Sequence, residues 1–427
     1  MVSELSGDFV ENAPVSAGLA DGWRRKGLVL GARRVTSWLF LPLLLCGLAT
    51  DPGVDAAGGP DLASQVKGSV DRACRWLKES QNPDGGYGPY SMRLENASDL
   101  GISALVLHAL AVSPRQYKAA DGPFVSRAVD FILERQQENG AFYDRRDPSL
   151  QNYKTSVVVM ALVALNATKY AEPIRKAQVF LRAIQLDEDG GYDPEKHLSY
   201  GGFGYGSGLR PDLSNTQYAL DALVASGVSG SDELFQKAVL YVSRSLNTTE
   251  VDVLLDELGI ASSGDGGGRY GPNITRGPVQ TLDGKSVFSS YGSMSYAALK
   301  AFLYARVDKD DPRVAGLWRW IGQNWTVREN PGMATPKNPG AGRHGYYYYL
   351  HTLSKALSLY GERRLKDSDG VEHDWVVELS THLLGVQSAE GFWTNESDRW
   401  WENIPALDSA YAVIVLSNCL SELKKEP

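Results

Sequence analysis

One turn recurs along this 427-residue chain, and it constrains the fold more than any other feature of the sequence. The turn first reads Gln81-Asn-Pro-Asp-Gly-Gly-Tyr87, and altered copies begin at Gln136, Gln185 and Gln387. Each copy follows a helix-like run that ends in apolar residues and precedes another run rich in Ala, Leu and Val. A fixed turn that is repeated between helices predicts an array of helical hairpins.

Two kinds of helix alternate in this array. In the run 123–137, Val125, Ala128 and Ile132 recur at helical spacing and form one apolar stripe, which is typical of a helix that covers a core. The run 153–168 is apolar on nearly every side, which indicates an inner layer. We expect outer helices near 66–80, 123–137, 172–185, 232–246, 312–324 and 373–386. We expect inner helices near 99–112, 153–168, 214–227, 291–305, 347–360 and 407–421.

Six such pairs in two layers predict an all-α fold, an α/α toroid of six helical hairpins with an inner and an outer ring, over residues 65–421. Residues 422–427 would form a short tail. An open superhelical solenoid is the alternative, but common helical repeats, at roughly 34–47 residues, are shorter than these hairpins. We therefore favour the closed ring.

Three connections between an outer and an inner helix are long and rich in glycine: 193–213, 259–290 and 325–346. Because they join helices in the same order, they should lie at the same end of the ring. Long insertions in a compact repeat are often lids over a site. Flexible surface insertions are the alternative.

Composition and cysteine usage narrow the function classes. The net charge of −8 gives no electrostatic indication of a nucleic-acid partner. Cys74 and Cys419, from the first and last hairpins, would be neighbours in a closed ring, and we expect two buried free thiols in preference to a disulfide. The sequence has no Cys-x-x-Cys or His-rich cluster, so no metal site and no cofactor is expected.

Residues 1–49 differ from the rest of the chain. A basic stretch that includes Arg24 and Arg33 precedes the apolar run Trp38–Leu48, which ends in a small-x-small pattern at Ala49. This arrangement predicts an export signal, followed by a linker at 50–64. The apolar run is shorter than the ~20 residues of a membrane span, so no transmembrane helix is expected in the mature chain. The protein should then be periplasmic or extracytoplasmic; a membrane anchor and a tail without a targeting role are alternatives.

The recurring turns resemble the Gln-Trp repeats of the terpenoid cyclases and protein prenyltransferase β-subunits, the group that also includes the prenyltransferase/squalene-oxidase repeat proteins. The resemblance covers roughly residues 65–421 and implies the same toroid. In squalene-type cyclases a Gln-x-x-x-Gly-x-Trp turn clamps helix ends together, and Gln387 through Trp393 matches it. The glutamine amide can bond free backbone groups of an adjacent helix end.

A second local match concerns the chemistry. Gly201-Gly-Phe203 followed by Arg210-Pro-Asp-Leu-Ser-Asn-Thr216 resembles the segment of squalene-hopene-type cyclases that reads Tyr-Pro-Asp-Val-Asp-Asp-Thr. The resemblance places Asp212 at the first Asp, with Ser214 and Asn215 at the next two. The middle Asp of the family motif protonates the isoprenoid alkene, and a serine hydroxyl is far too weak an acid for that step. Squalene-type cyclisation is therefore not expected. A literal Asp-x-Asp-Asp at Asp308–Asp311 is interpreted as a solvated helix start before Pro312.

The prenyltransferase branch offers one further residue. His351, which follows the tyrosine run Tyr346–Tyr349, resembles the zinc-binding histidine of that family. The preceding inner helix carries no Asp-x-Cys, and a zinc site needs three or four protein ligands. His351 is thus a candidate for contact with a ligand, with a core histidine as the alternative.

All inner helices should begin at the end of the ring that carries the insertions, so their positive dipole ends converge there. An apolar interior with a cationic rim predicts a small amphiphilic or isoprenoid ligand, and a ring plugged by side chains is the alternative. The candidate catalytic residues are Asp212 and His351. The candidate ligand-binding residues are Ser214, Asn215, Arg210, Arg343, His344, Tyr349 and Trp401.

Two hypotheses remain open at this point. In the first, the chain is an exported toroid that binds a ligand without catalysis, which the residues at 214 and 215 favour. In the second, it is a cyclase- or transferase-type enzyme with a rearranged acid/base site that uses Asp212, His351 or Glu402.

Overall fold

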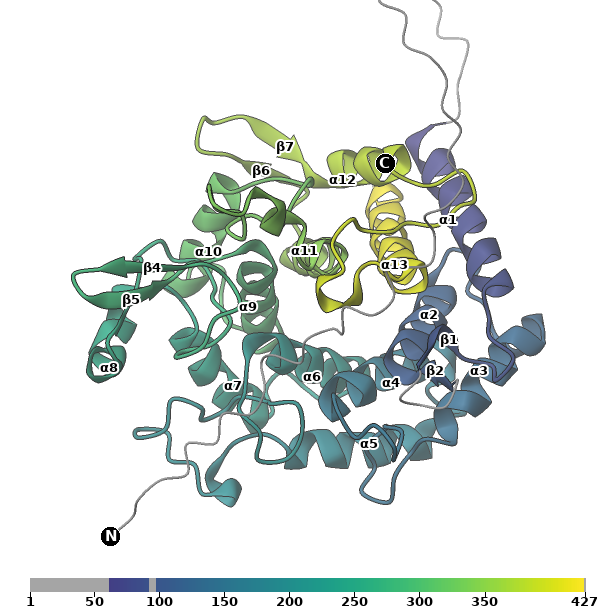
Figure 1. The fold of residues 1–427 in the computed structure, drawn as a ribbon, viewed down its shortest axis with the longest axis horizontal. Coiled ribbons are helices and arrows are strands. Elements are labelled where there is room, and N and C mark those ends of the chain that lie inside the picture. Colours follow the sequence, from purple (N-terminus) through teal and green to yellow (C-terminus); the bar gives the residue numbers. More distant parts are fainter. Residues whose placement is uncertain (1–60, 92–96, 426–427) are drawn as a thin grey trace, which may run out of the picture. The chain divides into compact units, whose positions relative to one another are not determined.

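The computed structural model describes residues 61–91 and 97–425, which belong to one helical unit, Gly58–Pro427 (Figure 1). The export signal predicted for residues 1–49 lies outside the described residues, as does most of the linker predicted for 50–64. Both stay predictions.

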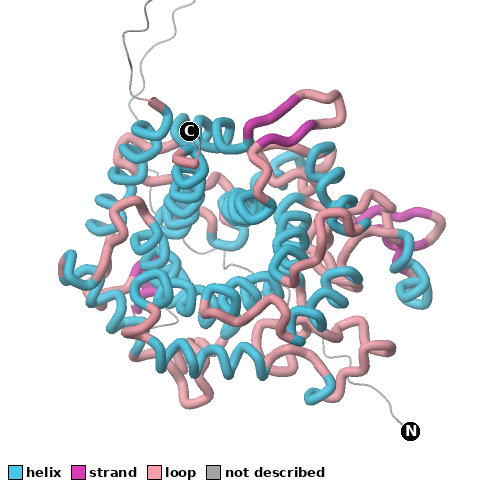
Figure 2. Tube along the Cα trace, turned by 180° about the vertical axis from the view of Figure 1, so that it is seen from behind, coloured by secondary structure: helices cyan, strands magenta, loops and turns pink. Residues whose placement is uncertain are grey.

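Within the described residues, two concentric layers of helices form a closed ring (Figures 1 and 2). The inner helices are α2 (Leu100–Val112), α4 (Gln151–Asn166), α6 (Leu213–Ala225), α9 (Gly292–Tyr304), α11 (Tyr346–Tyr360) and α13 (Pro405–Leu423). The outer helices are α1 (Leu62–Glu79), α3 (Pro123–Leu133), α5 (Ala171–Ala183), α7 (Glu233–Arg244), α10 (Pro312–Gln323) and α12 (Trp375–Gly385). Each inner helix packs against the next, and α13 packs against α2, so the predicted α/α toroid is confirmed and the open solenoid is wrong.

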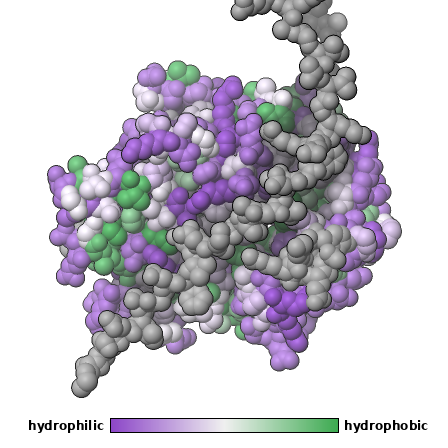
Figure 3. Space-filling view, viewed as in Figure 1, coloured by the Kyte–Doolittle hydropathy of each residue, from purple (hydrophilic) through white to green (hydrophobic). Residues whose placement is uncertain are grey.

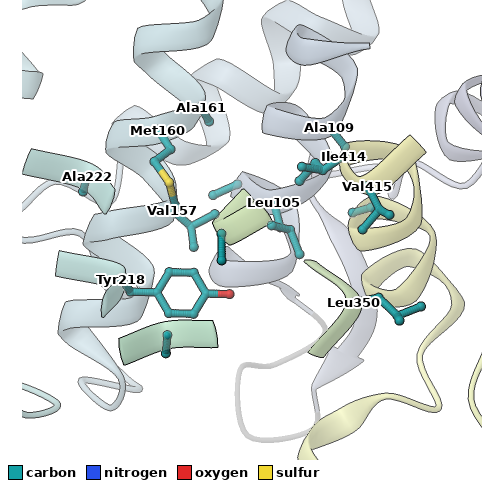
Figure 4. Packing of buried hydrophobic residues seen from close by; sticks show 14 of the residues in the cluster. Leu105, Ala109, Val157, Met160, Ala161, Tyr218, Ala222, Leu350, Ile414 and Val415 are labelled. Atoms are coloured by element: carbon teal, nitrogen blue, oxygen red, sulfur yellow. The ribbon is translucent and has the colours of Figure 1, made fainter. Parts of the chain in front are cut away.

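Burial separates the two layers as the sequence pattern predicts. The outer helix α1 buries one stripe that includes Val66, Val70 and Leu77. The inner helix α4 is buried on nearly every side over its first three turns. Figure 4 shows the resulting core, where side chains such as Leu105 of α2 and Val157 of α4 lie close together. By length and composition α13 could cross a membrane, but here it is an inner-ring helix and largely buried.

The glutamine of each recurring turn joins one hairpin to another. Gln81 Nε2 donates to the carbonyl of Gly85 in its own turn, at 2.8 Å, and to that of Phe124 in α3, at 2.7 Å. Gln387 Nε2 donates in the same way to the carbonyl of Ser69 in α1, at 3.1 Å, and so links the last hairpin to the first. The equivalent bonds run from Gln136 to Pro173 and from Gln185 to Leu234. These contacts hold the ring closed through backbone groups.

A glycine in the turns packs directly against the next outer helix. Gly140 and Gly201 have φ values of +88° and +82°, which only glycine adopts readily. A Cβ atom would lie 2.1 Å from the carbonyl oxygen of Lys176 at Gly140 and 1.9 Å from that of Lys237 at Gly201. The close approach of the two backbones therefore requires glycine at these positions.

In several turns, a backbone N–H also donates to a Ser or Thr hydroxyl near the start of the inner helix that follows. Thr216 Oγ1 accepts a hydrogen bond from the backbone N–H of Phe203 at 3.1 Å, and Ser409 Oγ accepts one from that of Trp393 at 3.0 Å. The same bond recurs from Tyr87 to Ser103, from Phe142 to Thr155 and from Gly268 to Ser295. This contact was not predicted from the sequence, although the Ser or Thr is the fourth or fifth residue of each of these inner helices.

Several connections contain short strands, and these strands were not predicted from the sequence. β1 (Tyr87–Ser91) pairs with β2 (Ala97–Asp99) in antiparallel fashion. In the insertion 259–290, β3 (Ile260–Ala261), β5 (Lys285–Phe288) and β4 (Val279–Leu282) form a sheet in the order β3-β5-β4. Beyond α11, the hairpin β6 (Arg364–Lys366) and β7 (Glu372–Asp374) lengthens a connection at the other end of the ring.

Exposed apolar side chains gather beside this sheet. On the largely hydrophilic face in Figure 3 they lie over β4 and the short helix α8 (Asp252–Leu255). They include Leu254, Leu258, Val279 and Leu282.

Cys74 of α1 and Cys419 of α13 are buried and free, as predicted, and the two helices pack against each other. Burial raises the pKa of both thiols to about 12, so they remain protonated and unreactive at neutral pH.

Candidate functional site

Asp212 stands at the start of α6, at the end of the ring that carries the glycine-rich insertions. Its side chain is buried, and both carboxylate oxygens are occupied: Oδ1 accepts from the backbone N–H of Asn215 at 2.7 Å, and Oδ2 accepts from Asn215 Nδ2 at 2.7 Å. Burial raises the pKa of Asp212 to about 6, against the lowering effect of these hydrogen bonds. The geometry is that of a helix N-cap.

We expect the substitution Asp212→Asn to keep the fold, because asparagine is an equally good N-cap. The pKa of Asp212 is about 6 in the folded state and 3.8 without the fold, so the folded state holds the proton more tightly. The bound proton therefore stabilises the folded state by up to about 3 kcal/mol. This stabilisation is complete below pH 4 and is lost as the pH rises through 6. Urea unfolding of both proteins between pH 4 and pH 8 should show a steeper decline in the wild type. Parallel pH profiles would contradict the prediction, and an unchanged melting temperature with unchanged lipid binding would remove Asp212 from the site.

Ser214, in the first turn of the same helix, connects two other inner helices. Its Oγ lies 2.6 Å from the hydroxyl of Tyr153 in α4 and 2.7 Å from that of Tyr348 in α11. Gln217 Nε2 also donates to the Tyr348 hydroxyl, at 3.2 Å. Because α9 lies between α6 and α11 in the ring, the bonds to Tyr348 cross the interior.

Two tyrosines meet across the full width of the ring. Tyr218 comes from α6 and Tyr411 from α13, which stand opposite each other in the inner layer, and their hydroxyl oxygens lie 3.0 Å apart. The rings of Tyr218 and Tyr348 are stacked, with centroids 6.0 Å apart. At this level the interior is occupied by aromatic side chains.

A buried ion pair lies deeper in the ring, and it was not predicted from the sequence. Lys300 Nζ of α9 lies 2.6 Å from Asp221 Oδ2 of α6, and both side chains are at most 1% exposed. The Tyr304 hydroxyl donates to Asp221 Oδ1 at 2.6 Å, and Lys300 also bonds Gln217. Burial would raise the pKa of Asp221, but the charges of Lys300 and Lys355 outweigh it and lower the pKa. The sequence feature that could have revealed this ion pair is Lys300, a charged residue inside the otherwise apolar helix α9.

His351 projects from α11 into the same interior. It is buried, its ring lies 5.2 Å from that of Tyr411, and its Nδ1 has no hydrogen-bond partner among the described residues. Burial lowers the pKa of His351 well below its usual value, so the imidazole is neutral. The structure thus separates His351 from Asp212 and gives it different neighbours.

The remaining predicted residues lie around the end of the ring where the inner helices begin. Arg343 Nη1 donates to the carbonyl of Arg328 at 2.9 Å, and its guanidinium stacks on the Tyr346 ring at 3.7 Å. Arg210 Nη2 donates to the carbonyl of Asn273 at 2.9 Å. Both arginines therefore hold loops in place through these contacts.

His344, Trp401 and Tyr349 differ in their surroundings. His344 lies edge-on to the Trp400 ring at 6.3 Å, and Trp401 is 60% exposed. The buried Tyr349 directs its hydroxyl to the carbonyl of Thr326, at 2.6 Å, in the insertion after α10. Asp212, Ser214 and Asn215 thus come together at α6, whereas these three residues are spread over the rim.

Glu402 and Asp408 form a buried carboxyl pair beside that rim. Glu402 accepts hydrogen bonds from the backbone N–H groups of Tyr347 and Tyr348, at 3.1 and 2.8 Å, and so caps α11. Asn395 bridges the pair, because its Nδ2 donates to Glu402 and its backbone N–H donates to Asp408. Burial raises the pKa of Glu402 to about 7, and burial together with the Glu402 charge raises that of Asp408 to about 10. Asp408 is therefore neutral at pH 7.

Part of the chain is similar in sequence to known terpenoid cyclases. A family model of the squalene-hopene cyclase C-terminal domain matches residues 94–251. The lanosterol synthase erg7A of Aspergillus fumigatus is 27% identical over 133 residues, which cover 29% of this chain and 17% of that protein. The squalene–hopene cyclase of Zymomonas mobilis is 25% identical over 265 residues, which cover 54% of this chain and 39% of the cyclase. The chain thus spans less than half the length of these relatives.

Solved structures agree on the fold. The apo structure of the type II terpene cyclase MstE from Scytonema superposes with a TM-score of 0.52 and 14% identity, over 85% of this chain and 99% of that one. At this identity the likeness concerns the arrangement of helices and not the chemistry.

Proposed function

Because this chain belongs to the terpenoid cyclase superfamily in its fold and repeats, we propose that it is an exported protein that binds an isoprenoid or other amphiphilic ligand inside the ring without cyclising it. The relatives are named as a lanosterol synthase and a squalene–hopene cyclase, which suggests the isoprenoid class. N-terminal sequencing of the protein from its native host tests the export part, and a mature chain that still begins at Met1 in the cytosol would contradict it.

One observation carries the proposal: the contact between Tyr218 and Tyr411 in the middle of the ring. Burial raises the pKa of both hydroxyls, so they stay neutral and act only as hydrogen-bond donors and acceptors. A hydroxyl pair of this kind can exchange its mutual bond for bonds to a ligand hydroxyl or carbonyl at small net cost. The faces of Tyr218 and Tyr348 and the apolar inner helices around them would enclose a hydrocarbon chain.

Binding without cyclisation is favoured by the groups at the start of α6. Both oxygens of Asp212 accept hydrogen bonds from Asn215, and these bonds favour the carboxylate that caps the helix over a protonated acid that could protonate an alkene. Ser214, at the position that the family resemblance assigns to the general acid, is a hydroxyl held between two tyrosines. Alkene protonation needs a much stronger acid than either hydroxyl type.

The test is a binding titration with geranylgeraniol and with squalene, read by native mass spectrometry and by the shift in melting temperature. We expect the wild type to bind both compounds. Tyr411→Phe should bind geranylgeraniol with several-fold lower affinity, because the alcohol loses a hydrogen-bond partner. Squalene, which has no polar group, should be unaffected. Tyr117→Phe, a buried tyrosine that packs on Phe124 of the outer ring, is the matched control.

Two outcomes would overturn the proposal. One is a wild-type protein that retains neither compound. The other is a Tyr411→Phe variant that cannot be distinguished from Tyr117→Phe.

A cyclase- or transferase-type enzyme with a rearranged acid/base site is the second candidate, and the Glu402–Asp408 pair favours it. A carboxylic acid that stays neutral at pH 7 can donate a proton to a bound substrate. In that case the titration mixtures would yield converted product, and Asp408→Asn would abolish the conversion. Recovery of unchanged geranylgeraniol and squalene would exclude these two compounds as substrates and support binding alone.

A further inference from the structure

Three inner helices direct polar residues at one place in the depth of the ring. On each helix two of these residues are separated by four positions, which puts them on one face. The pairs are Gln217 and Asp221 on α6, Lys300 and Tyr304 on α9, and His351 and Lys355 on α11. A fourth inner helix, α2, contributes the buried His108, whose pKa responds to the charges of Lys355 and Asp221.

Hydrogen-bond donors outnumber acceptors in this cluster. The carboxylate of Asp221 has both oxygens engaged, by Lys300 and by Tyr304. Lys355 Nζ lies 4.0 Å from Asp221 Oδ1, which is beyond hydrogen-bond distance. Two ammonium groups thus face one carboxylate, and the cluster carries one surplus positive charge.

Two imidazoles in the cluster have an unused nitrogen. The Nδ1 atoms of His108 and His351 have no hydrogen-bond partner among the described residues, although the two side chains are only 8% and 2% exposed. An unpaired buried polar atom costs about 1–3 kcal/mol, so such atoms in a native protein normally meet a water, an ion or a ligand. No group of three or more metal-ligating side chains occurs in the described part of the chain, so the partner is either water or a ligand that forms hydrogen bonds.

We propose that Lys355, His351 and His108 form a binding site for an oxyanion, a phosphate or carboxylate group, which takes up a proton as it binds. An oxyanion supplies several acceptors and a negative charge, and the cluster lacks both. Burial and the charge of Lys355 lower the pKa of His108 to about 3, while Asp221 acts in the opposite sense. Burial lowers the pKa of His351 as well; Lys300, Lys355 and His108 add to the effect, and Asp221 opposes it. A bound anion would raise both values and draw a proton from solution.

The position of the site is compatible with an anion. Lys355 is 30% exposed, so the cluster is reachable from solvent, whereas Lys300 and Asp221 lie behind it at 0% and 1%. His351 and Lys355 lie more than one turn from either end of α11. The negative charge at the helix C-termini falls off within one turn, so it acts only weakly here. The site adjoins the tyrosines proposed to hold the isoprenoid ligand, because the His351 ring lies 5.2 Å from that of Tyr411, but its charged groups are different residues.

The experiment titrates the folded protein with sodium phosphate, and separately with sodium acetate, at constant ionic strength and pH 6.5. Binding is followed by the NMR signals of the histidine rings, and proton uptake is followed in unbuffered solution. The wild type should bind with uptake of up to one proton and with shifts of the His351 and His108 signals. Lys355→Met should weaken binding at least tenfold. Lys309→Met, which removes a 46% exposed lysine paired with Glu362, is the control and should bind as the wild type does.

The relative affinities for phosphate and acetate identify which oxyanion the site prefers. Equal affinities in Lys355→Met and Lys309→Met would overturn the proposal. Binding without proton uptake, or histidine signals that do not move at saturating anion, would also overturn it, because water would then be the partner of the imidazoles.

Discussion

Replacing Lys300 by methionine should lower the free energy of unfolding by about 3–5 kcal/mol. The substitution leaves the carboxylate of Asp221 in the middle of the ring without its close counter-ion, with Lys355 no nearer than 4.0 Å. Removal of one partner from a buried pair is costly because the remaining charge stays out of water. Urea unfolding at pH 7 measures the change.

Two controls separate burial from charge. The double variant Lys300→Met/Asp221→Leu removes both charges, and we expect it to recover most of the lost stability, since an apolar pair of similar volume is often neutral. Lys309→Met breaks an exposed ion pair with Glu362 and should cost less than about 1 kcal/mol. A Lys300→Met variant as stable as Lys309→Met would mean that the interior is hydrated.

The second large effect is expected at a turn glycine. Gly201→Ala should cost about 2–5 kcal/mol, the sum of a left-handed backbone and a clash that must move an outer helix. The added Cβ would lie 1.9 Å from the carbonyl oxygen of Lys237 in α7. Thermal and urea unfolding should both record the loss.

Gly191→Ala is a control from the same connection. Gly191 has nearly the same φ, +81° against +82°, but a Cβ there would meet no atom within 4 Å. Gly191→Ala should lower the free energy of unfolding by only about 1–2 kcal/mol, the cost of the left-handed backbone without a clash. Similar losses at the two sites would show that the turn does not pack tightly on α7.

The fold could be predicted from the sequence because its signals are local. The stretch expected at 312–324 is α10, Pro312–Gln323, where Pro312 and the Asp311 cap mark the start. The stretch expected at 123–137 ends early, at Leu133, because the chain already turns over residues 134–135, ahead of Gln136. The strands were missed because runs of two to five residues within the connections carry no clear alternation of apolar and polar residues.

The candidate site was predictable only where its contacts are local in sequence. The bonds between Asp212 and Asn215 span three residues and follow from the N-cap pattern. Contacts such as Ser214 with Tyr348, or Lys300 with Asp221, join different inner helices. They depend on the rotation of each helix within the closed ring, which a single sequence does not specify. The roles of Asp212 and His351 in binding or catalysis remain predictions.

The bond from Gln387 to Ser69 gives the first and last hairpins the same kind of contact as consecutive ones. An open array can gain or lose a terminal hairpin, because every remaining hairpin keeps its neighbour and the array still has free ends. A circle cannot, because deletion of any unit leaves two apolar flanks without a neighbour and changes the curvature that the others need. Duplication or loss of one hairpin during evolution would therefore disrupt the whole assembly, whereas variation in the lengths of the connections would leave it intact.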